Sequence, residues 1–198
     1  MRKFVFIALI AIGFMSCSDD ETTMVSLTQT EKDDLLTLRE EEKLARDVYL
    51  YAFDKYGLDI SSNISQSEQT HMDKILDLLN KYGLEDPALA NRGEFTNQTL
   101  QTLYNDLTAQ VDVSELTALV VGATIEDLDI RDIEDFESRT DKSDILSVYD
   151  KLKCGSRNHM RAYYNQLVLQ DYIYNTQFIS SDELSDIIVS DNEQCGRN

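Results

Sequence analysis

Proline, glycine and tryptophan are scarce or absent in this chain of 198 residues, which contains one Pro, seven Gly and no Trp. Proline breaks helices and glycine weakens them, so their scarcity favours long helices over a fold rich in turns. The sequence also has no glycine-rich phosphate loop and no convincing strand pattern. The length suits one domain with a substantial core and hardly two. We therefore expect a single all-α domain.

Basic residues are few as well. The chain has 18 Lys and Arg against 37 Asp and Glu, which gives a formal net charge of −19. This charge repels the phosphates of nucleic acids, so we exclude nucleic acid as a partner. Cationic partners or metal ions suit the charge better, although most of it is expected to solvate the outer faces of helices.

The one long apolar run lies at the N-terminus, from Phe4 to Met15, and follows Arg2 and Lys3. A basic start, a short apolar middle and a small residue before the cut are typical of a secretory signal, and the run is short for a membrane span. Because Cys17 follows Phe-Met-Ser, the segment resembles a bacterial lipoprotein lipobox. That resemblance implies cleavage before Cys17 and acylation of this residue, with a simple signal peptide as the alternative.

Four segments follow from this interpretation. We assign residues 1–16 to the signal peptide, 17–27 to an acidic tether, 28–175 to the helical domain and 176–198 to a C-terminal tail with a short helix. The mature chain keeps 16 basic and 37 acidic residues, a formal charge of −21. We expect it to be held by its lipid in the cell envelope, outside the cytoplasm, on the outer membrane or the cell surface.

Two cysteines remain in the mature domain, Cys154 and Cys195, and their spacing matches neither a metal site nor a Cys-x-x-Cys electron relay. We expect two free or surface thiols. The alternative is a disulfide that ties the C-terminal tail to the last long helix, because disulfides form outside the cytoplasm.

Helical periodicity extends over four long segments, residues 27–56, 65–82, 113–136 and 142–175. A long connection, 83–112, separates the second from the third and contains a short helix near 96–110. Another short helix is expected over 180–190. Four amphipathic helices with one long crossover predict a four-helix bundle.

Each long helix has an ionisable residue within its apolar stripe. Glu42 lies in the first stripe between Leu38 and Ala45, although Glu41 belongs to a competing stripe that we judge less well packed. A buried carboxylate is costly unless a positive group meets it. The other stripes contain Glu68, His71, Glu126, Asp129 and His159.

The two histidines of the chain, His71 and His159, both fall in these stripes, and Glu68 precedes His71 by three residues on the same helix face. Imidazoles and carboxylates from facing helices suit a first-row transition metal better than calcium or magnesium. Taken singly, each acid is more often paired with a neighbouring cation, and each histidine is more often a satisfied core residue. Their joint occurrence predicts a metal site, with a metal-free buried polar network as the alternative.

Several phrases carry a family resemblance. "EKLARDVY", residues 42–49, resembles the first metal-bearing helix of rubrerythrin-type, ferritin-like proteins. Together with "SEQTHM", "GATIEDLDI" and "GSRNHMRAY", it resembles the bacterial and archaeal domain-of-unknown-function family 2202, over roughly residues 35–167. The resemblance implies a ferritin-like bundle with a metal centre and names no reaction.

The ferritin-like pattern has a Glu from each of two helices and Glu-x-x-His from each of the other two. Here Ser156 stands where the second Glu-x-x-His has its Glu, and a serine hydroxyl is a poor ligand. Asp129, one turn after Glu126, could compensate. The predicted ligands are Glu42, Glu68, His71, Glu126, Asp129 and His159.

Other residues are expected beside the ligands. Tyr49 and Tyr163 could hydrogen-bond a ligand or carry an electron, although core packing is the commoner role of such residues. Arg46 could balance the acids, or simply form an ion pair at the surface. Gly155 is expected to mark a bend or a close helix contact.

These residues predict a metal-binding lipoprotein that holds one or two ions. Iron is the expected metal, with zinc and manganese as alternatives, and a diiron site could react with dioxygen or peroxide. The alternatives are a non-catalytic metal-binding protein and a structural helical protein of the cell envelope.

Overall fold

The computed structural model describes residues 26–196, and within them every regular element is a helix. The prediction of an all-α chain is therefore confirmed. The lipobox, its Cys17 and the signal segment lie outside the described residues. The six helices are α1 (Gln29–Tyr56), α2 (Asp59–Tyr82), α3 (Gln98–Val111), α4 (Glu115–Glu137), α5 (Ser143–Leu169) and α6 (Ser181–Val189).

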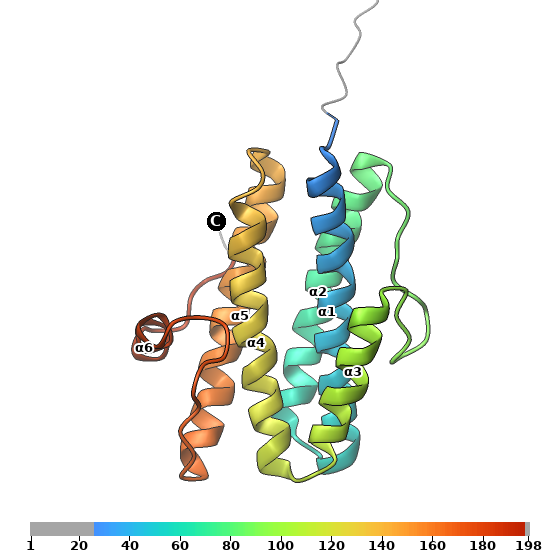
Figure 1. Cartoon of the computed structure of the whole chain (residues 1–198). Coiled ribbons are helices and arrows are strands. Elements are labelled where there is room, and N and C mark those ends of the chain that lie inside the picture. Colours follow the sequence, from blue (N-terminus) through green and yellow to red (C-terminus); the bar gives the residue numbers. More distant parts are fainter. Residues whose placement is uncertain (1–25, 197–198) are drawn as a thin grey trace, which may run out of the picture.

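The four long helices, α1, α2, α4 and α5, lie side by side (Figure 1). α1 packs against α2, and α4 packs against α5; the two pairs meet through α1 with α4 and through α2 with α5. The shorter α3 covers the outside of α1 and α4, and α6 packs on α5. Side chains from all four long helices can therefore meet at the centre.

Local sequence signals set the ends of the helices. Thr28 caps α1, because its side chain accepts the Glu31 backbone N–H while Glu31 reaches back to the Thr28 backbone N–H. Gly57 ends α1 and Gly83 ends α2, both in the left-handed conformation with φ of 68° and 67°. A threonine at the start of a helix and glycines at its end are the residue types that such positions favour.

Two predicted helix boundaries are wrong by one or two turns. α2 begins at Asp59 rather than residue 65, because the polar run after Leu58 stays helical and buries Ser61 and Ile64. α5 ends at Leu169 rather than residue 175, because Asp171 takes a left-handed conformation with φ of 55°.

Buried charges on α1 hold the long connection between α2 and α3. Asp47 is fully buried and accepts hydrogen bonds from Lys43 Nζ at 2.6 Å and from the Gly93 backbone N–H at 2.9 Å. Lys43 also donates to the Asn91 carbonyl, and its ammonium lies 4.4 Å from the centre of the Phe95 ring. The connection is thereby fixed to the middle of α1.

The segment between α5 and α6 is anchored in the same way by one acid of α4. Asp127 is fully buried and accepts hydrogen bonds from the Tyr174 hydroxyl and from the backbone N–H groups of Gln177 and Ile179. The chain therefore folds back along α5, which carries the C-terminal residues alongside it (Figure 1).

This return corrects the cysteine prediction. Cys154 of α5 and Cys195 of the tail form a disulfide rather than two free thiols, across a sequence separation of 41 residues. The reason is tertiary: α6 and the residues after it return to α5, a path that helical periodicity does not reveal.

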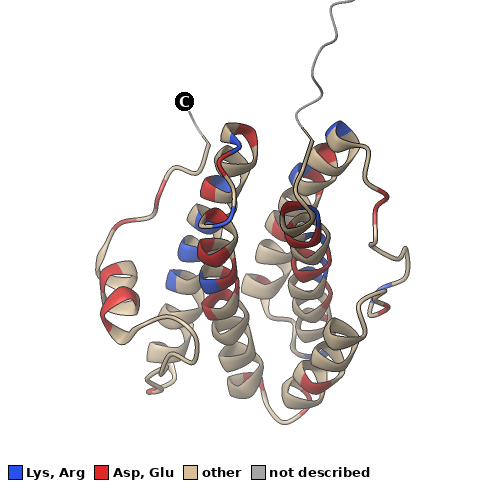
Figure 2. Cartoon of the chain, turned by 45° about the horizontal axis from the view of Figure 1, so that its top comes forward, with Lys and Arg blue, Asp and Glu red and all other residues tan. Residues whose placement is uncertain are grey.

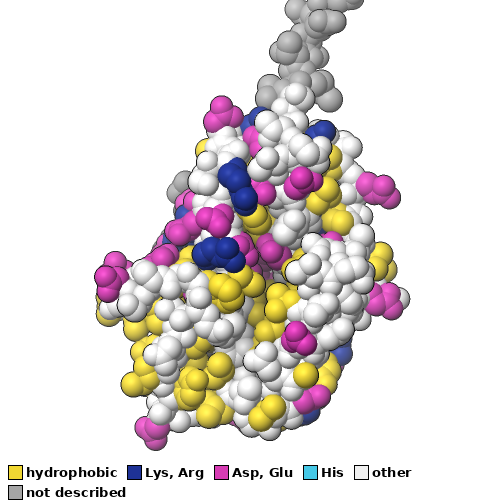
Figure 3. All heavy atoms as spheres, in the orientation of Figure 1, with side chains coloured by type: hydrophobic (Ala, Val, Ile, Leu, Met, Phe, Trp, Pro, Cys, Tyr) yellow, Lys and Arg dark blue, Asp and Glu magenta, His cyan; other side chains and the backbone are white. Residues whose placement is uncertain are grey.

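Charge and apolar surface are distributed unevenly over the outside. Acidic residues occur on all the long helices, while several Lys and Arg gather over the middle of the α4–α5 pair (Figure 2). Apolar side chains gather over the lower part of the face in Figure 3, where charged side chains are fewer. Within residues 26–196, no helix is both long and apolar enough to cross a membrane.

The apolar core consists of two clusters with a polar layer between them. One cluster includes Ala45 and Ile64, and the other includes Leu38 and Ile75. Glu42 lies between Leu38 and Ala45 along α1, and Glu68 and His71 lie between Ile64 and Ile75 along α2. The acids and histidines predicted as ligands therefore lie on the level where the apolar core is interrupted.

Candidate metal centre

Five of the predicted ligands come together in two groups with one shared member. Glu42, Glu68 and His71 form the first group, and Glu68, Glu126 and His159 form the second. In each group the ligand atoms lie within 4.8 Å of one another, and every member is buried. α1 supplies Glu42, α2 supplies Glu68 and His71, α4 supplies Glu126 and α5 supplies His159.

The two oxygens of Glu68 face different histidines. Glu68 Oε2 lies 2.8 Å from His71 Nδ1, and Glu68 Oε1 lies 2.8 Å from His159 Nδ1. His71 Nδ1 also lies 3.1 Å from Glu42 Oε2, and His159 Nδ1 lies 3.4 Å from Glu126 Oε2. The two imidazole rings are 5.7 Å apart, centre to centre. Glu68 is thus placed to contribute one oxygen to each of two neighbouring positions.

Several polar atoms of this layer are buried without a hydrogen bond. Glu68 Oε1 and His159 Nδ1 are close, yet neither makes a hydrogen bond of proper geometry. Such groups are costly in a protein interior, and a bound ion is one of the standard explanations. The unsatisfied atoms of this layer are Glu42 Oε1, Glu68 Oε1, Glu126 Oε2, Asp129 Oδ2 and His159 Nδ1.

The acids shift the pKa values of the histidines. Burial alone would lower the pKa of His71, but the negative charges of Glu42 and Glu68 outweigh it and raise this pKa to about 10. The pKa of His159 is likewise raised well above its usual value, because Glu68 and Glu126 outweigh burial. Without a metal ion, protons therefore provide the positive charge in this layer.

The carboxylates shift in opposite directions. Burial raises the pKa of Glu42 to about 7, although His71 opposes the shift, and burial also raises the pKa of Glu126. Burial would raise the pKa of Glu68 too, but the two histidines outweigh it and lower this pKa. Glu68 is therefore the acid that stays ionised between both rings.

Asp129 lies outside both groups. Asp129 as a whole is 4% exposed, and its Oδ2 has no hydrogen-bond partner among the described residues. Burial raises its pKa, and the charges of Glu42, Glu126 and Glu68 raise it further. Asp129 thus belongs to the acidic layer without joining a three-ligand group.

Glu41 is an acid that the sequence reasoning set aside. Its Oε2 is buried without a partner, and burial together with Asp132 and Glu42 raises its pKa to about 8. The run Glu40-Glu41-Glu42 offered more than one buried acid, but choosing one helix face for Glu42 left Glu41 out of the prediction.

Two tyrosines pack beside the acids. The Tyr49 hydroxyl donates to Glu126 Oε1, which leaves Glu126 Oε2 on the side of His159. The Tyr163 hydroxyl donates to Ser61 Oγ, and the two phenol rings are 5.4 Å apart. Tyr49 therefore contacts a predicted ligand directly, whereas Tyr163 contacts Tyr49 from the core.

Arg46 and Ser156 do not reach the carboxylates of the two groups. Arg46 pairs with Asp47 and donates to Gln69 on the outer side of α1 and α2. The Ser156 hydroxyl donates to the Leu152 carbonyl within α5. Among the described residues, neither side chain belongs to the two candidate ligand groups.

Two glycines provide the space that the site needs. A Cβ at Gly155 would lie 2.6 Å from His71 Nε2, so only glycine lets this ring approach the α5 backbone. A Cβ at Gly122 would lie 2.3 Å from a ring carbon of Tyr163. The expectation of a close helix contact at Gly155 is met by the His71 ring.

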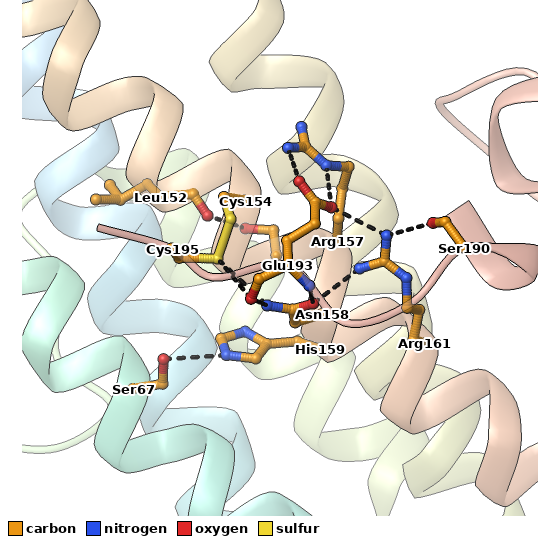
Figure 4. Close-up of a disulfide and its surroundings, with 11 residues drawn as sticks. Ser67, Leu152, Cys154, Arg157, Asn158, His159, Arg161, Ser190, Glu193 and Cys195 are labelled. Carbon is orange, nitrogen blue, oxygen red and sulfur yellow. Dashed lines mark hydrogen bonds and ion pairs between the residues drawn. A yellow bond between two sulfur atoms is a disulfide. The ribbon is translucent and has the colours of Figure 1, made fainter. Parts of the chain in front are cut away.

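Ser67 is a residue that the sequence analysis missed. Its hydroxyl lies 3.0 Å from His159 Nε2, so it holds the outer edge of this ring while Nδ1 faces the acids (Figure 4). A partner on the second ring nitrogen commonly orients a ligating histidine. Ser67 lies four residues before His71, and this helix-face spacing was the available signal.

The donor set fits a transition metal. Each group offers two carboxylates and one imidazole, which suit iron, zinc or manganese, and the charge of a cation would replace the protons now required on the histidines. The prediction that Glu68 and His159 meet in the interior agrees with their 2.8 Å contact.

Comparison with known proteins places the chain in a family. The DUF2202 profile, described as an uncharacterised protein domain, matches residues 31–191. The uncharacterised protein MJ0754 of Methanocaldococcus jannaschii is 48% identical over 169 residues, which are 85% of this chain and 91% of that protein. The crystal structure of hypothetical protein MJ0754 from Methanococcus jannaschii matches with a TM-score of 0.83, over 84% of this chain and 96% of the solved chain. The resemblance to domain-of-unknown-function family 2202 is confirmed, and the chain belongs to the DUF2202 family.

Proposed function

We propose that this protein is a ferritin-like four-helix bundle that binds two transition-metal ions between its long helices. One position uses Glu42, Glu68 and His71, and the other uses Glu68, Glu126 and His159. Iron is the proposed metal, with zinc or manganese as alternatives, and the proposed activity is the reduction of dioxygen or peroxide.

The observation that carries the proposal is the shared Glu68. Its two oxygens each lie 2.8 Å from a different histidine, and Glu68 Oε1 and His159 Nδ1 have no hydrogen bond of proper geometry. A polar network without an ion would be expected to satisfy these atoms with hydrogen bonds. Two cations, one on each side of Glu68, account for the arrangement more completely.

Two bound ferrous ions would supply electrons for the reduction of dioxygen or peroxide. The chain contributes orientation: Ser67 fixes the ring of His159, and Tyr49 fixes one oxygen of Glu126. Both histidines must lose the proton at Nδ1 when that atom binds a metal, so metal binding releases protons. The two flanking apolar clusters limit access of water.

Elemental analysis followed by iron loading tests the proposal. We expect the chain, purified without a histidine tag, to hold up to two metal ions. After anaerobic Fe(II) loading, oxygen or peroxide should produce a fast near-ultraviolet ferric absorption. The His71→Ala variant should lose half or more of the bound metal. The Glu68→Gln variant should bind metal more weakly at both proposed positions.

Glu85→Gln is the matched control, because Glu85 is exposed and belongs to neither ligand group. It should keep the full metal content. Unchanged metal content and melting temperature in His71→Ala would show that the site is wrong. Bound metal without any response to oxygen or peroxide would instead favour a non-catalytic metal-binding protein.

We also propose that the protein is a lipoprotein of the cell envelope, anchored through Cys17. The N-terminal pattern supports this proposal, and the Cys154–Cys195 disulfide is typical of compartments outside the cytoplasm. Mass spectrometry of the mature N-terminus should find acyl chains on Cys17, and Cys17→Ala should move the protein from the membrane to the soluble fraction. A soluble wild-type protein with an unmodified N-terminus would contradict the anchor.

A further inference from the structure

A cavity of about 670 Å³ opens on the outer side of the two histidines, between α2 and α5. His71 and His159 line it from the inside, and both are at least nine-tenths buried, with 5% and 8% exposure. Because the Nδ1 atoms of these rings face the carboxylates, the outer edges of the rings face away from them. The two imidazole rings therefore separate this cavity from the buried carboxylates.

The C-terminal tail forms one wall of this cavity and is firmly held (Figure 4). Cys195 is bonded to Cys154, and Glu193 makes ion pairs with Arg157 and Arg161. The Asn158 side chain donates to the Glu193 carbonyl and accepts the Glu193 backbone N–H. The only acid that lines the cavity, Glu193, is thus neutralised by two arginines.

Two lysines line the same cavity without an acidic partner. Lys74 of α2 and Lys151 of α5 are half-buried, and neither makes an ion pair within the described residues. The same two lysines also line an adjoining groove together with Asp77 and Asp144, where the ion pair that forms joins Asp144 to Lys81. The net charge of the chain is −19, yet these two ammonium groups beside the cavity have no acidic partner in the part of the chain that the structure describes.

His71 adds a further polar atom. Its Nε2 lies over Gly155 and has no hydrogen-bond partner within the described residues, whereas His159 Nε2 is engaged by Ser67. When a metal ion occupies His71 Nδ1, the remaining ring hydrogen is on Nε2 and can be donated. This step depends on the proposed metal centre.

We propose that this cavity binds a small oxyanion, a carboxylate or a phosphate, through Lys74, Lys151 and the Nε2–H of His71. The neutral side-chain amide of Gln194, which also lines the cavity, completes the site. Two divalent ions held by three carboxylates would leave a net positive charge behind His71, which further favours an anion. A metal cation is disfavoured, because the charged groups left unpaired in the cavity are both positive.

Titration of the disulfide-intact mature protein, loaded with zinc, tests the inference. The probes are malonate for a carboxylate and inorganic phosphate for a phosphate, followed by calorimetry and by NMR of the histidine rings. At least one probe should bind once per chain and shift the His71 ring signals. Lys74→Gln combined with Lys151→Gln should weaken binding at least tenfold.

The matched control is Lys32→Gln combined with Lys55→Gln, which removes the same charge away from this cavity. It should bind the probe as the wild type does. Equal weakening in both double variants, or no binding of either probe to the zinc-loaded wild type, overturns the inference.

Zinc content is measured on every sample, so that the two proposals fail separately. If the wild type takes up no zinc, the same titration is run on the metal-free protein, and the metal centre is refuted when iron loading fails as well. Lysine-dependent binding there still supports the anion site, and its absence refutes it. If the zinc-loaded protein binds neither malonate nor phosphate, the proposed metal centre stands and the proposed anion site is refuted.

Discussion

At the scale of single residues, the layer of acids and histidines is a cost that the rest of the fold must offset. Glu42, Glu126 and Asp129 are buried, and burial raises the pKa of each. Raised carboxyl pKa values mean that the ionised forms are destabilised by folding. A sequence selected for stability alone would place apolar residues here, so the layer is best explained by a ligand.

Gly155→Ala tests whether the position of the His71 ring depends on the absence of a side chain at residue 155. The new methyl group would lie 2.6 Å from His71 Nε2, so the ring must move away from its present place. We expect a loss of about 1–3 kcal/mol of stability, as for other overpacked cores, and a lower zinc content. Thermal unfolding and elemental analysis measure both. Ser156→Ala, at the next position, should retain its zinc. Full zinc content in Gly155→Ala would show that metal binding does not need the space that Gly155 leaves for the His71 ring.

Asp129→Asn tests whether Asp129 is a metal ligand or only lies beside the ligands. The amide keeps the shape and cannot ionise, so folding at neutral pH no longer requires a buried acid to take up a proton, and the metal-free protein should gain about 1–3 kcal/mol of stability. Zinc content should stay unchanged, because Asp129 lies outside both groups. Asp106→Asn, at an exposed position, should change neither quantity. A halved zinc content in Asp129→Asn would instead assign Asp129 to the site.

At the scale of the elements, periodicity and capping signals predict most of the fold. Thr28, Gly57 and Gly83 mark helix ends that the structure places at the same residues. The start of α2 and the end of α5 were misplaced, because polar residues such as Ser61 become buried and Asp171 reverses the chain without a glycine. The ligands were accessible to sequence reasoning because each interrupts an apolar stripe.

What the sequence hid depends on tertiary contacts. Ser67 reaches His159 across 92 positions, and Cys154 meets Cys195 only because α6 returns along α5. Gly155 has no partner of its own; its role is to leave room for a ring from another helix. No local pattern carries such information, since each depends on how two distant segments pack.

Lys43→Met tests the anchor of the long connection before α3. Lys43 is 1% exposed and pairs with the fully buried Asp47 at 2.6 Å. Removal of one partner of a buried pair costs about 3–5 kcal/mol; Arg46 and Gly93 still contact Asp47, so we expect about 3 kcal/mol. Urea unfolding measures the loss.

The exposed pair of Lys55 with Asp112 provides the control for that change. Lys55→Met should lower the stability far less than Lys43→Met does, because exposed ion pairs contribute little. Equal losses in Lys43→Met and Lys55→Met would show that the buried pair does not anchor the connection.

At the scale of the whole molecule, the tail and the helices form one unit because the disulfide joins residues 41 positions apart. Closing a loop of that length restricts the unfolded chain and contributes about 2–4 kcal/mol in the chain-entropy description. Cys154→Ala with Cys195→Ala should lower the stability by that amount and weaken anion binding, because Gln194 and Glu193 line the cavity. Thermal unfolding and the malonate titration measure the two effects. A double variant with unchanged stability and unchanged binding would show that the ion pairs of Glu193 alone hold the tail.

The pH dependence of stability reports on the whole acidic layer. In the metal-free protein, the pKa values of Glu42, Glu41 and His71 are raised to about 7, 8 and 10, and that of Asp129 is raised as well. A group whose pKa is raised by folding contributes stability below its unfolded pKa and loses it as the pH rises through the folded value. For the acids this window begins near pH 4.5, and for His71 it begins near pH 6.5 and extends to about pH 10.

All these groups act in the same direction, so the metal-free protein should become less stable from pH 5 to pH 8. Glu68, Glu31 and Glu193, whose pKa values are lowered, act in the opposite direction, but only below about pH 4.5. Bound zinc opposes this loss of stability at higher pH, because zinc replaces the protons on the ligands and binds more tightly as the ligands lose those protons. The difference in melting temperature between zinc-loaded and metal-free protein should therefore widen from pH 5 to pH 8. A metal-free melting temperature that rises over this range, or a zinc effect that does not depend on pH, would show that the layer is not a proton-loaded cation site.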